Sequence, residues 1–263
     1  MSGHSKWNNI KRKKEKTDGA RAKVFTKIGR EIAVAVKEGG GNPASNSKLA
    51  ALIAKAKANS VPNDNIQRII KRAEGGDKTE YEAITYEGYG PGGIAVMVET
   101  LTDNRNRTAA DVRSAFSHAG GSLGTSGSVA FQFERKGQIM VPKEVETGDK
   151  KNPVKPNGAA ADEEEFMLAV AEAGGDDYED ADEEWIVYTQ PSDLMAVKKA
   201  LEEQGVQVKG AEMTMEATTP ATVTANDAKK VMRLVDKLEE LEDLQNVYHT
   251  MDITEEIAAA LDE

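Results

Sequence analysis

The sequence contains no cysteine, only three histidines and no long apolar run, and each shortage excludes a class of protein. Without cysteine there is no disulfide framework, no thiolate metal site and no cysteine nucleophile. His4, His118 and His249 are too scattered to indicate a zinc site. No stretch of about 18 apolar residues occurs, so the sequence predicts no membrane-spanning helix. The first twenty residues lack the apolar core of a secretory signal, and we therefore expect a cytoplasmic protein.

Charge is distributed unevenly along the 263 residues. The chain has 34 Lys and Arg against 45 Asp and Glu, a net charge of −11. Residues 1–80 hold 18 basic and 8 acidic side chains, whereas residues 81–263 hold 16 and 37. A basic segment joined to an acidic body is typical of polyanion-binding proteins, because a basic face gains free energy by releasing counterions from phosphates. A solvated basic surface is the alternative.

The length predicts two or three domains, and the first, 1–78, is predicted to be a basic three-helix domain. Apolar residues recur every four positions from Val24 to Val36, which indicates an amphipathic helix. Its basic residues fall together on the opposite side: Lys23, Lys27, Arg30 and Lys37. Further helices are expected over 45–59 and 62–75, and the last turns Arg68, Lys71 and Arg72 outward.

From residue 81 the pattern alternates between strands and helices. Strands are expected over 94–101, 129–133, 138–141, 185–189 and 207–215, and helices over 108–119, 163–173 and 192–204. The run from 138 to 215 is nearly a complete α/β unit, whereas the unit before it lacks one helix and one strand. The tail supplies both, over 226–242 and 246–251. We infer that the second unit is inserted into the first.

The predicted fold class is therefore α+β, with an N-terminal three-helix domain followed by two α/β sandwich-like domains, the third inserted in the second. The predicted domains are 1–78, a basic helical domain; 79–134 plus 217–263, an α/β domain; and 135–216, the inserted α/β domain. A serial arrangement of the two α/β units is the alternative, but it would leave the first sheet thin.

Three segments of the sequence could bind an anion, a phosphate or a metal ion. Asp103 to Thr108 joins a strand to a helix N-terminus, where Arg105 and Arg107 favour an anion, unless they pair with local acids. The segment from Tyr86 to Gly93 lacks a P-loop ending and is interpreted as a tight turn before a strand. Asp176 to Glu184 holds seven carboxylates in nine residues but shows no calcium-loop spacing, which favours a solvated linker over a metal site.

The densest basic stretch surrounds Trp7, which either stacks on a base or packs against the helices. Lys6, Lys11, Arg12, Lys13, Lys14 and Lys16 carry the charge. If about six of these meet phosphates, log K should fall against log salt with a slope near ~−5 on duplex DNA. No Ser, His and Asp set has the context of a nucleophile, so we expect no enzyme activity, no metal and no cofactor.

Several of these motifs resemble the YebC family of gene-expression regulators, whose members include a mitochondrial translational activator of cytochrome c oxidase. The resemblance rests on six segments, which are GHSKW at residues 3–7, FTKIGREI at 25–32, VPNDNIQRIIKRA at 61–73, YEGYGPGG at 86–93, TDNRNRT at 102–108 and VAFQFERKG at 129–137. It implies a helical domain plus two α/β domains, in agreement with the periodicity, and regulation without catalysis.

The resemblance leaves the target open between DNA, for a transcriptional regulator, and ribosomal RNA, for a ribosome-associated factor that relieves stalls such as those at consecutive prolines. A protein-interaction adaptor and a metal-dependent hydrolase that uses the acidic cluster are two further hypotheses. We expect a monomer that binds nucleic acid, with or without the ribosome, and no membrane. The predicted nucleic-acid contacts are Lys6, Trp7, Lys11, Arg12, Lys13, Lys14, Lys16, Lys23, Lys27, Arg30, Arg68, Lys71, Arg72, Arg105 and Arg107.

Overall fold

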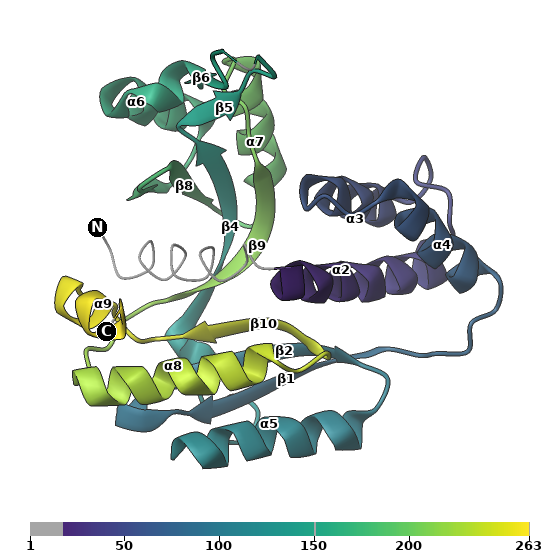
Figure 1. Ribbon diagram of the computed structural model, residues 1–263, viewed down its shortest axis with the longest axis vertical. Helices are drawn as coiled ribbons and strands as arrows, with labels where there is room; N and C mark the ends of the chain where they lie inside the picture. Colours follow the sequence, from purple (N-terminus) through teal and green to yellow (C-terminus); the bar gives the residue numbers. More distant parts are fainter. Residues whose placement is uncertain (1–17, 150, 263) are drawn as a thin grey trace. The chain divides into compact units, whose positions relative to one another are not determined.

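The computed structural model describes residues 18–149 and 151–262, which fall into two compact units (Figure 1). One unit combines the helical domain with the first sheet, from residues 18–132 and Ala221–Met251. The other is built from Phe133–Pro220 and Asp252–Ala258. The α+β fold class is confirmed: three helices precede two four-stranded antiparallel sheets with their helices. The predicted domain boundaries stay a prediction.

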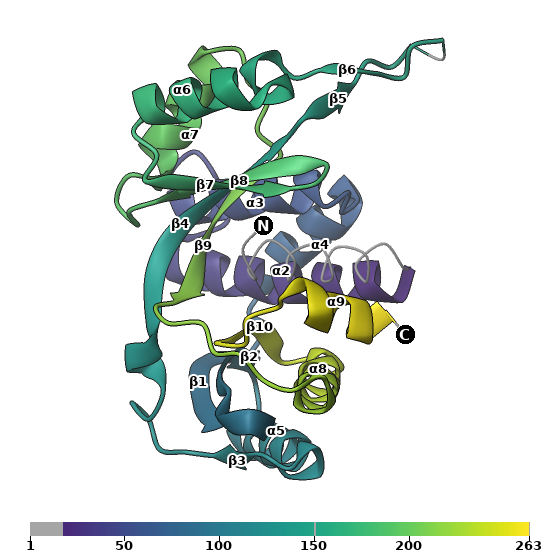
Figure 2. The same cartoon turned by 90° about the vertical axis from the view of Figure 1, so that its left-hand side faces the viewer.

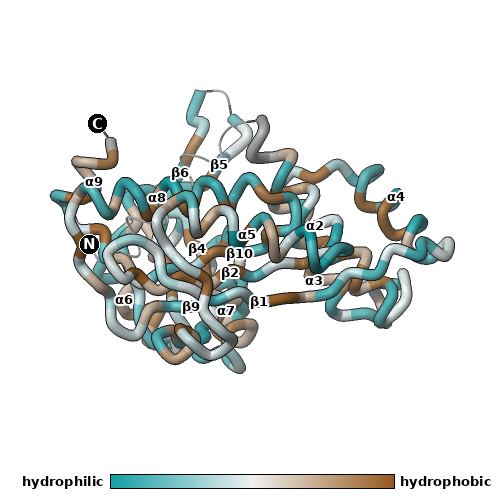
Figure 3. Tube along the Cα trace, turned by 90° about the horizontal axis from the view of Figure 1, so that it is seen from below, coloured by the Kyte–Doolittle hydropathy of each residue, from teal (hydrophilic) through white to brown (hydrophobic). Residues whose placement is uncertain are grey.

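The helical domain consists of α2 (Asp18–Gly39), α3 (Ser47–Ala58) and α4 (Asn63–Glu74), close to the predicted ranges. Ile28 and Ile32 of α2 pack with Leu49 of α3 and with Ile66 and Ile70 of α4 in one apolar core. The tube along α4 alternates between hydrophobic and hydrophilic colours (Figure 3), as expected of a helix that buries one face.

Asn46 fixes the connection between α2 and α3. Its Oδ1 accepts a hydrogen bond from the backbone N–H of Leu49 at 3.0 Å and so caps α3. Its Nδ2 donates to the carbonyl oxygens of Ala35 and Gly40, both at 2.8 Å, near the end of α2. One buried side chain therefore satisfies backbone groups at the ends of both helices.

The first sheet has the strand order β10-β2-β1-β3. Its strands are β1 (Glu82–Tyr89), β2 (Ala95–Thr102), β3 (Ser122–Leu123) and β10 (Leu244–His249). The helices α5 (Arg105–Ala119) and α8 (Ala225–Glu239) lie side by side on one face (Figure 1). Because β10 pairs antiparallel with β2, the tail completes this sheet, and the second unit is an insertion, as predicted.

Two predictions about the first sheet need correction. Strand β1 was not predicted, although it pairs along its whole length with β2. The strand predicted over 129–133 is wrong: Ala130–Gln132 forms the 3-10 helix η2, and β4 begins only at Phe133. The tight turn predicted over residues 86–93 is correct only at its end: residues 86–89 belong to β1, and only Pro91–Gly93 turns, as the 3-10 helix η1, in which Gly92 has a φ of 69°.

The inserted unit is built on a second sheet of order β7-β8-β4-β9. Its strands are β4 (Phe133–Pro142), β7 (Asp177–Ala181), β8 (Glu184–Thr189) and β9 (Gly210–Ala217), with a separate hairpin of β5 (Glu144–Glu146) and β6 (Val154–Pro156). The helices are η3 (Gly158–Ala161), α6 (Glu163–Ala173) and α7 (Leu194–Glu203), and a last helix, α9 (Glu255–Asp262), follows β10. Figure 2 shows α6 and α7 together on one side of this sheet.

The acidic run from Asp176 to Glu184 is not the linker that the sequence predicts. It forms β7 and the turn into β8, with Asp182 in the left-handed region at a φ of 62°. Tyr178, inside the run, packs edge-on against Phe166 and Trp185, with ring centroids 5.9 and 5.6 Å away. This aromatic contact anchors an otherwise charged strand.

Candidate nucleic-acid interface

The basic face of α2 is turned toward the first sheet and its connections. Lys23 Nζ donates to the carbonyl oxygen of Glu239 at 3.3 Å, and Lys27 Nζ donates to that of Gln245 at 3.4 Å. Lys37 Nζ donates to the carbonyl oxygen of Thr79. The predicted clustering of these cations on one side is thus correct, but they have protein partners, and their contact with phosphate stays a prediction.

Arg30, the fourth cation of this face, binds Asp243. Asp243 precedes β10, is 5% exposed, and also accepts hydrogen bonds from Thr102 Oγ1 at 3.1 Å and Thr108 Oγ1 at 2.6 Å. Arg107 Nη2 lies 2.9 Å from its Oδ2. Burial acts to raise the pKa of Asp243, but hydrogen bonds from Thr108, Arg107 and Arg30 hold it below its usual value. Arg30 and Arg107 therefore share a buried carboxylate as their counterion.

The loop before α5 follows the alternative considered from the sequence, in which its arginines pair with local acids. Arg105 Nη1 lies 3.3 Å from Glu82 Oε1. Arg107 pairs with Asp103 at 2.9 Å in addition to Asp243, and these two carboxylates raise its pKa. Asn104 caps the helix by accepting from the backbone N–H of Arg107. Phosphate contact at this loop stays a prediction.

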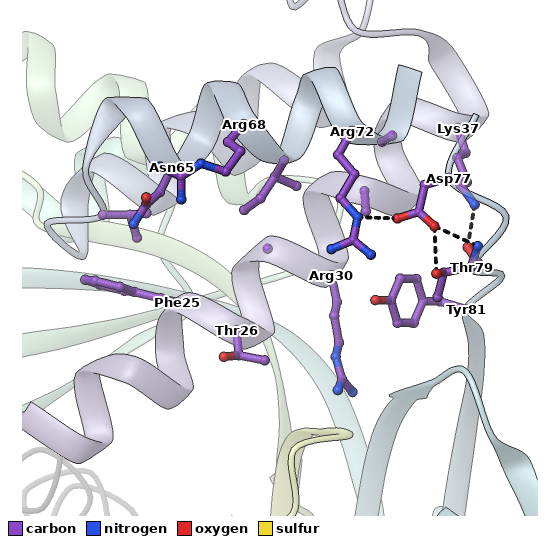
Figure 4. Close-up of a pocket in the computed structure, with 15 residues that line it drawn as sticks. Phe25, Thr26, Arg30, Lys37, Asn65, Arg68, Arg72, Asp77, Thr79 and Tyr81 are labelled. Carbon is purple, nitrogen blue, oxygen red and sulfur yellow. Dashed lines mark hydrogen bonds and ion pairs between the residues drawn. The ribbon is translucent and has the colours of Figure 1, made fainter. Parts of the chain in front are cut away.

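A cavity of about 420 Å³ lies between α2, α4 and the segment 77–81, and we call it the α2–α4 cavity (Figure 4). Gly29 faces α4 here, since a Cβ at this position would meet Cδ1 of Ile69 at 3.0 Å. The polar and aromatic side chains of its lining are Phe25, Thr26, Arg30, Lys37, Asn65, Arg68, Arg72, Asp77, Thr79 and Tyr81. Four are cations, and Asp77 is the one carboxylate among the described lining residues.

Asp77 organises one end of the α2–α4 cavity. Its Oδ1 accepts from the backbone N–H of Thr79 at 3.0 Å and from Thr79 Oγ1 at 2.7 Å, and its Oδ2 lies 2.7 Å from Arg72 Nε. The backbone bond from Thr79 and the charge of Arg72 lower the pKa of Asp77. Arg30 extends beside Tyr81, with its guanidinium carbon 5.6 Å from the ring centroid.

The other end of the α2–α4 cavity holds side chains without such partners. Arg68 is exposed, and neither its guanidinium nor the carboxamide of Asn65 has a hydrogen-bond or ion-pair partner among residues 18–149 and 151–262. Figure 4 shows both beside Phe25, with Arg72, Lys37 and Tyr81 at the opposite end. This end of the cavity therefore presents hydrogen-bond donors that no other described residue uses.

The structure brings some predicted contact residues together and leaves others apart. Arg30, Arg68 and Arg72 line the α2–α4 cavity, with Arg68 and Arg72 at opposite ends, whereas Lys71 is exposed and does not line it. Lys6, Trp7, Lys11, Arg12, Lys13, Lys14 and Lys16 lie outside the described residues. Sequence reasoning missed Phe25, Asn65, Tyr81 and Asp243. The position of Phe25 beside the apolar stripe of α2, rather than within it, was the one available signal.

Neither a cluster of metal-ligating side chains nor a membrane-spanning helix is found in the described part of the chain. There, no three His, Asp or Glu side chains are grouped so that they could hold a metal ion. None of the described helices combines the length and apolarity needed to cross a membrane.

Comparison with known proteins shows similarity over nearly the whole chain. A family model described as "TACO1/YebC protein N-terminal domain" matches residues 5–76, and one described as "TACO1/YebC second and third domain" matches residues 81–251. The matched ranges cover the helical domain and both sheets.

Individual relatives agree with these models. A "Probable transcriptional regulatory protein" of Rubrobacter xylanophilus is 49% identical over 98% of both chains, and one of Agathobacter rectalis is 49% identical over 95% of this chain and 98% of its own. A crystal structure of a conserved hypothetical protein from Aquifex aeolicus is 41% identical, covers 89% of this chain and 91% of its own, and superposes with a TM-score of 0.77.

Proposed function

We propose, because the chain belongs to the TACO1/YebC family, that it is a non-catalytic regulator of gene expression that binds nucleic acid through its helical domain. Membership in the family confirms the resemblance drawn from the motifs. The observation that carries the proposal is the α2–α4 cavity: four cations, Arg30, Lys37, Arg68 and Arg72, line it, and Asp77 is the one carboxylate among its described lining residues. Cations gathered in this way neutralise phosphates and release their counterions.

Our proposal also includes the predicted N-terminal contacts, which lie outside the described residues. Residues 1–80 carry ten more basic than acidic side chains, whereas residues 81–263 have an acidic excess of 21. An acidic body repels phosphate, so it favours encounters in which the basic domain meets the nucleic acid first. This steering should weaken as salt rises.

DNA is the target that the relatives' names support, because they are called probable transcriptional regulatory proteins. Family resemblance also covers ribosome-associated members, and phosphate contacts alone serve DNA and ribosomal RNA alike. In a lysate, a promoter footprint that survives excess competitor DNA supports transcription. Sedimentation with ribosomes after nuclease removal of DNA supports translation instead.

The central experiment measures binding of the full chain to labelled DNA and RNA by fluorescence anisotropy. We expect log K to fall linearly with log salt between about 50 and about 200 mM, as for any polyanion contact. Replacing Lys11, Arg12, Lys13 and Lys14 together by Glu should abolish binding.

A matched control makes the same change of charge elsewhere, by replacing Lys151, Lys155, Lys198 and Lys199 with Glu in the inserted unit. This variant should bind within about twofold of the original chain, because its changes lie outside the basic domain. Unchanged affinity of the N-terminal variant, or equal losses in both variants, would reject the proposal.

A further inference from the structure

We propose that the α2–α4 cavity binds one unstacked nucleotide of a single-stranded nucleic acid, with the base at the Phe25 end and the adjoining phosphates at the Arg72 end. This inference rests on the proposed function and narrows its target. Neither the family descriptions nor the relatives' names assign a ligand to this cavity.

An aromatic ring, that of Phe25, lies at one end of the α2–α4 cavity. Phe25 is the only aromatic residue in the sequence from 18 to 80. It is half-buried, packs against the edge of the helical core, and lines a cavity that is also lined by four cations. An aromatic face that adjoins cations is the combination used by proteins that bind single strands, because every base has a π-face to stack.

Beside that ring lie two side chains, Asn65 and Arg68, whose hydrogen-bonding groups no other described residue uses. Asn65 and Arg68 are three residues apart on α4, so they project from the same face of the helix. The Asn65 carboxamide offers two donors and one acceptor, which suits the edge of an unpaired base. Arg68 offers a planar fork of donors that suits a phosphate or a guanine edge.

The opposite end of the cavity is positively charged, because Arg72 and Lys37 line it. Arg72 uses Nε for Asp77, and no bond from its two terminal nitrogens to the other residues drawn is marked in Figure 4. Lys37 adds a second positive charge there. The phosphates that adjoin a bound base along the strand would therefore meet cations at this end.

The size of the cavity agrees with one nucleotide. Its volume of about 420 Å³ lies within the range of roughly 300–1,000 Å³ typical of sites for small ligands. A base within a duplex is stacked on both faces and paired along one edge, so it must be unstacked and unpaired before it can enter such a site. The inference therefore predicts a preference for single strands over a duplex of the same sequence.

The test uses the full chain and oligonucleotides of about 12 nucleotides, as single-stranded DNA, single-stranded RNA and duplex DNA. We expect both single strands to bind more tightly than the duplex. Phe25→Leu keeps an apolar side chain but removes the ring, and should weaken single-strand binding by roughly 5- to 150-fold, the effect of losing one stacked base. Its duplex affinity should not change.

Two variants control for folding and for nonspecific aromatic contact. Phe25→Tyr keeps the ring and should bind within about threefold of the original chain. Phe131→Leu removes an aromatic ring that is 74% exposed and does not line the cavity, and it should have no effect. Asn65→Ala should weaken single-strand binding while leaving the thermal midpoint close to its original value.

A single 2-aminopurine in the oligonucleotide reports stacking directly. Its fluorescence should be quenched on binding to the original chain and not to Phe25→Leu. Adenosine monophosphate serves as the small-molecule competitor: reversal of the quench by the free nucleotide at a much lower concentration than by an unlabelled strand would replace the polymer by a metabolite as ligand. Equal affinity for duplex and single strand, with Phe25→Leu unchanged, would overturn this inference and leave the proposed function intact. Absence of salt-dependent binding to any nucleic acid would overturn both.

Discussion

The guanidinium of Arg30 lies 2.5 Å from the carboxylate of Asp243, although 213 residues separate the two in sequence. Both side chains are largely buried, at 11% and 6% exposure. Arg30 Nη1 also donates to the carbonyl oxygen of Leu101 at 3.0 Å. A cation that the sequence pattern assigns to phosphate therefore holds α2 against the connections of the first sheet.

The first prediction concerns this buried junction. Asp243→Ala leaves Arg30 and Arg107 beside an empty position and removes the acceptor of Thr108. We expect the free energy of unfolding to fall by about 3–5 kcal/mol, because breaking a buried ion pair strands the remaining charge. Urea denaturation of the full chain, monitored by circular dichroism, measures the change.

Glu242→Ala is the matched control for that variant. Glu242 lies 3.6 Å from Arg30, but its side chain is 84% exposed, so its loss should cost less than about 1 kcal/mol. Similar losses in the Glu242 and Asp243 variants would show that the buried junction does not stabilise the fold.

The second prediction is a dependence of stability on pH. The pKa of Asp243 is held below its usual value because hydrogen bonds outweigh the effect of burial. Its contribution to stability is therefore complete above the unfolded pKa, about 3.9, and is lost as the pH falls through the lower folded pKa. Urea midpoints measured from about pH 6 to about pH 2.5 should fall less steeply for Asp243→Asn than for the original chain. Equal slopes for the two proteins would mean that the pKa of Asp243 is the same in the folded and unfolded states.

Periodicity in the sequence was sufficient to predict the helices, because each buries one apolar stripe. The insertion could also be predicted, since an incomplete unit must find its missing strand elsewhere in the chain. The strand prediction at 129–133 failed for a local reason: the backbone N–H groups of Val129 and Ala130 donate to the Glu87 carboxylate, which leaves them unable to join a strand ladder. Strand β7 was not predicted because most of its residues are charged. The aromatic packing of Tyr178 that anchors the strand cannot be read from the local sequence.

The candidate site was harder to predict than the fold. Spacing places Lys23, Lys27 and Arg30 on one face of α2, but it does not say whether that face meets water or another part of the chain. The partners that decide the matter, Asp243 above all, are more than 200 residues away. A cavity between two helices likewise depends on how they pack. The local sequence therefore could not predict that Asn65 and Tyr81 line it.

The third prediction concerns Glu87, which is 6% exposed in β1. Its carboxylate accepts from the backbone N–H of Gly127 at 2.7 Å and from those of Val129 and Ala130 at 2.8 Å. Burial acts to raise the pKa of Glu87, but these three bonds hold it below its usual value. In Glu87→Gln an NH₂ group replaces one acceptor oxygen, so at least one N–H loses its partner, at a cost of about 1–3 kcal/mol.

Hydrogen exchange provides the local readout for that variant. Amides 127–130 should exchange faster in Glu87→Gln, while those of α3 and α4 keep their rates, because the lost bonds lie in one loop. Glu82→Gln is the control: Glu82 is exposed, and its ion-pair partner Arg105 is exposed as well, so this variant should leave exchange unchanged. Unaltered exchange at 127–130 in Glu87→Gln would contradict the role assigned to this carboxylate.

The fourth prediction is a gain in binding. Asp77→Asn removes the one carboxylate of the described cavity lining, while an Asn oxygen can still accept from Thr79. Arg72 then loses its counterion and becomes available to phosphate. We expect affinity for a single strand to rise by roughly 3- to 10-fold at about 50 mM salt, and the gain to shrink as salt screens the charge. Glu38→Gln adds the same charge beside Lys48, outside the cavity, and should change affinity by less than about twofold. Equal gains in the two variants would show that net charge, rather than the α2–α4 cavity, sets the affinity.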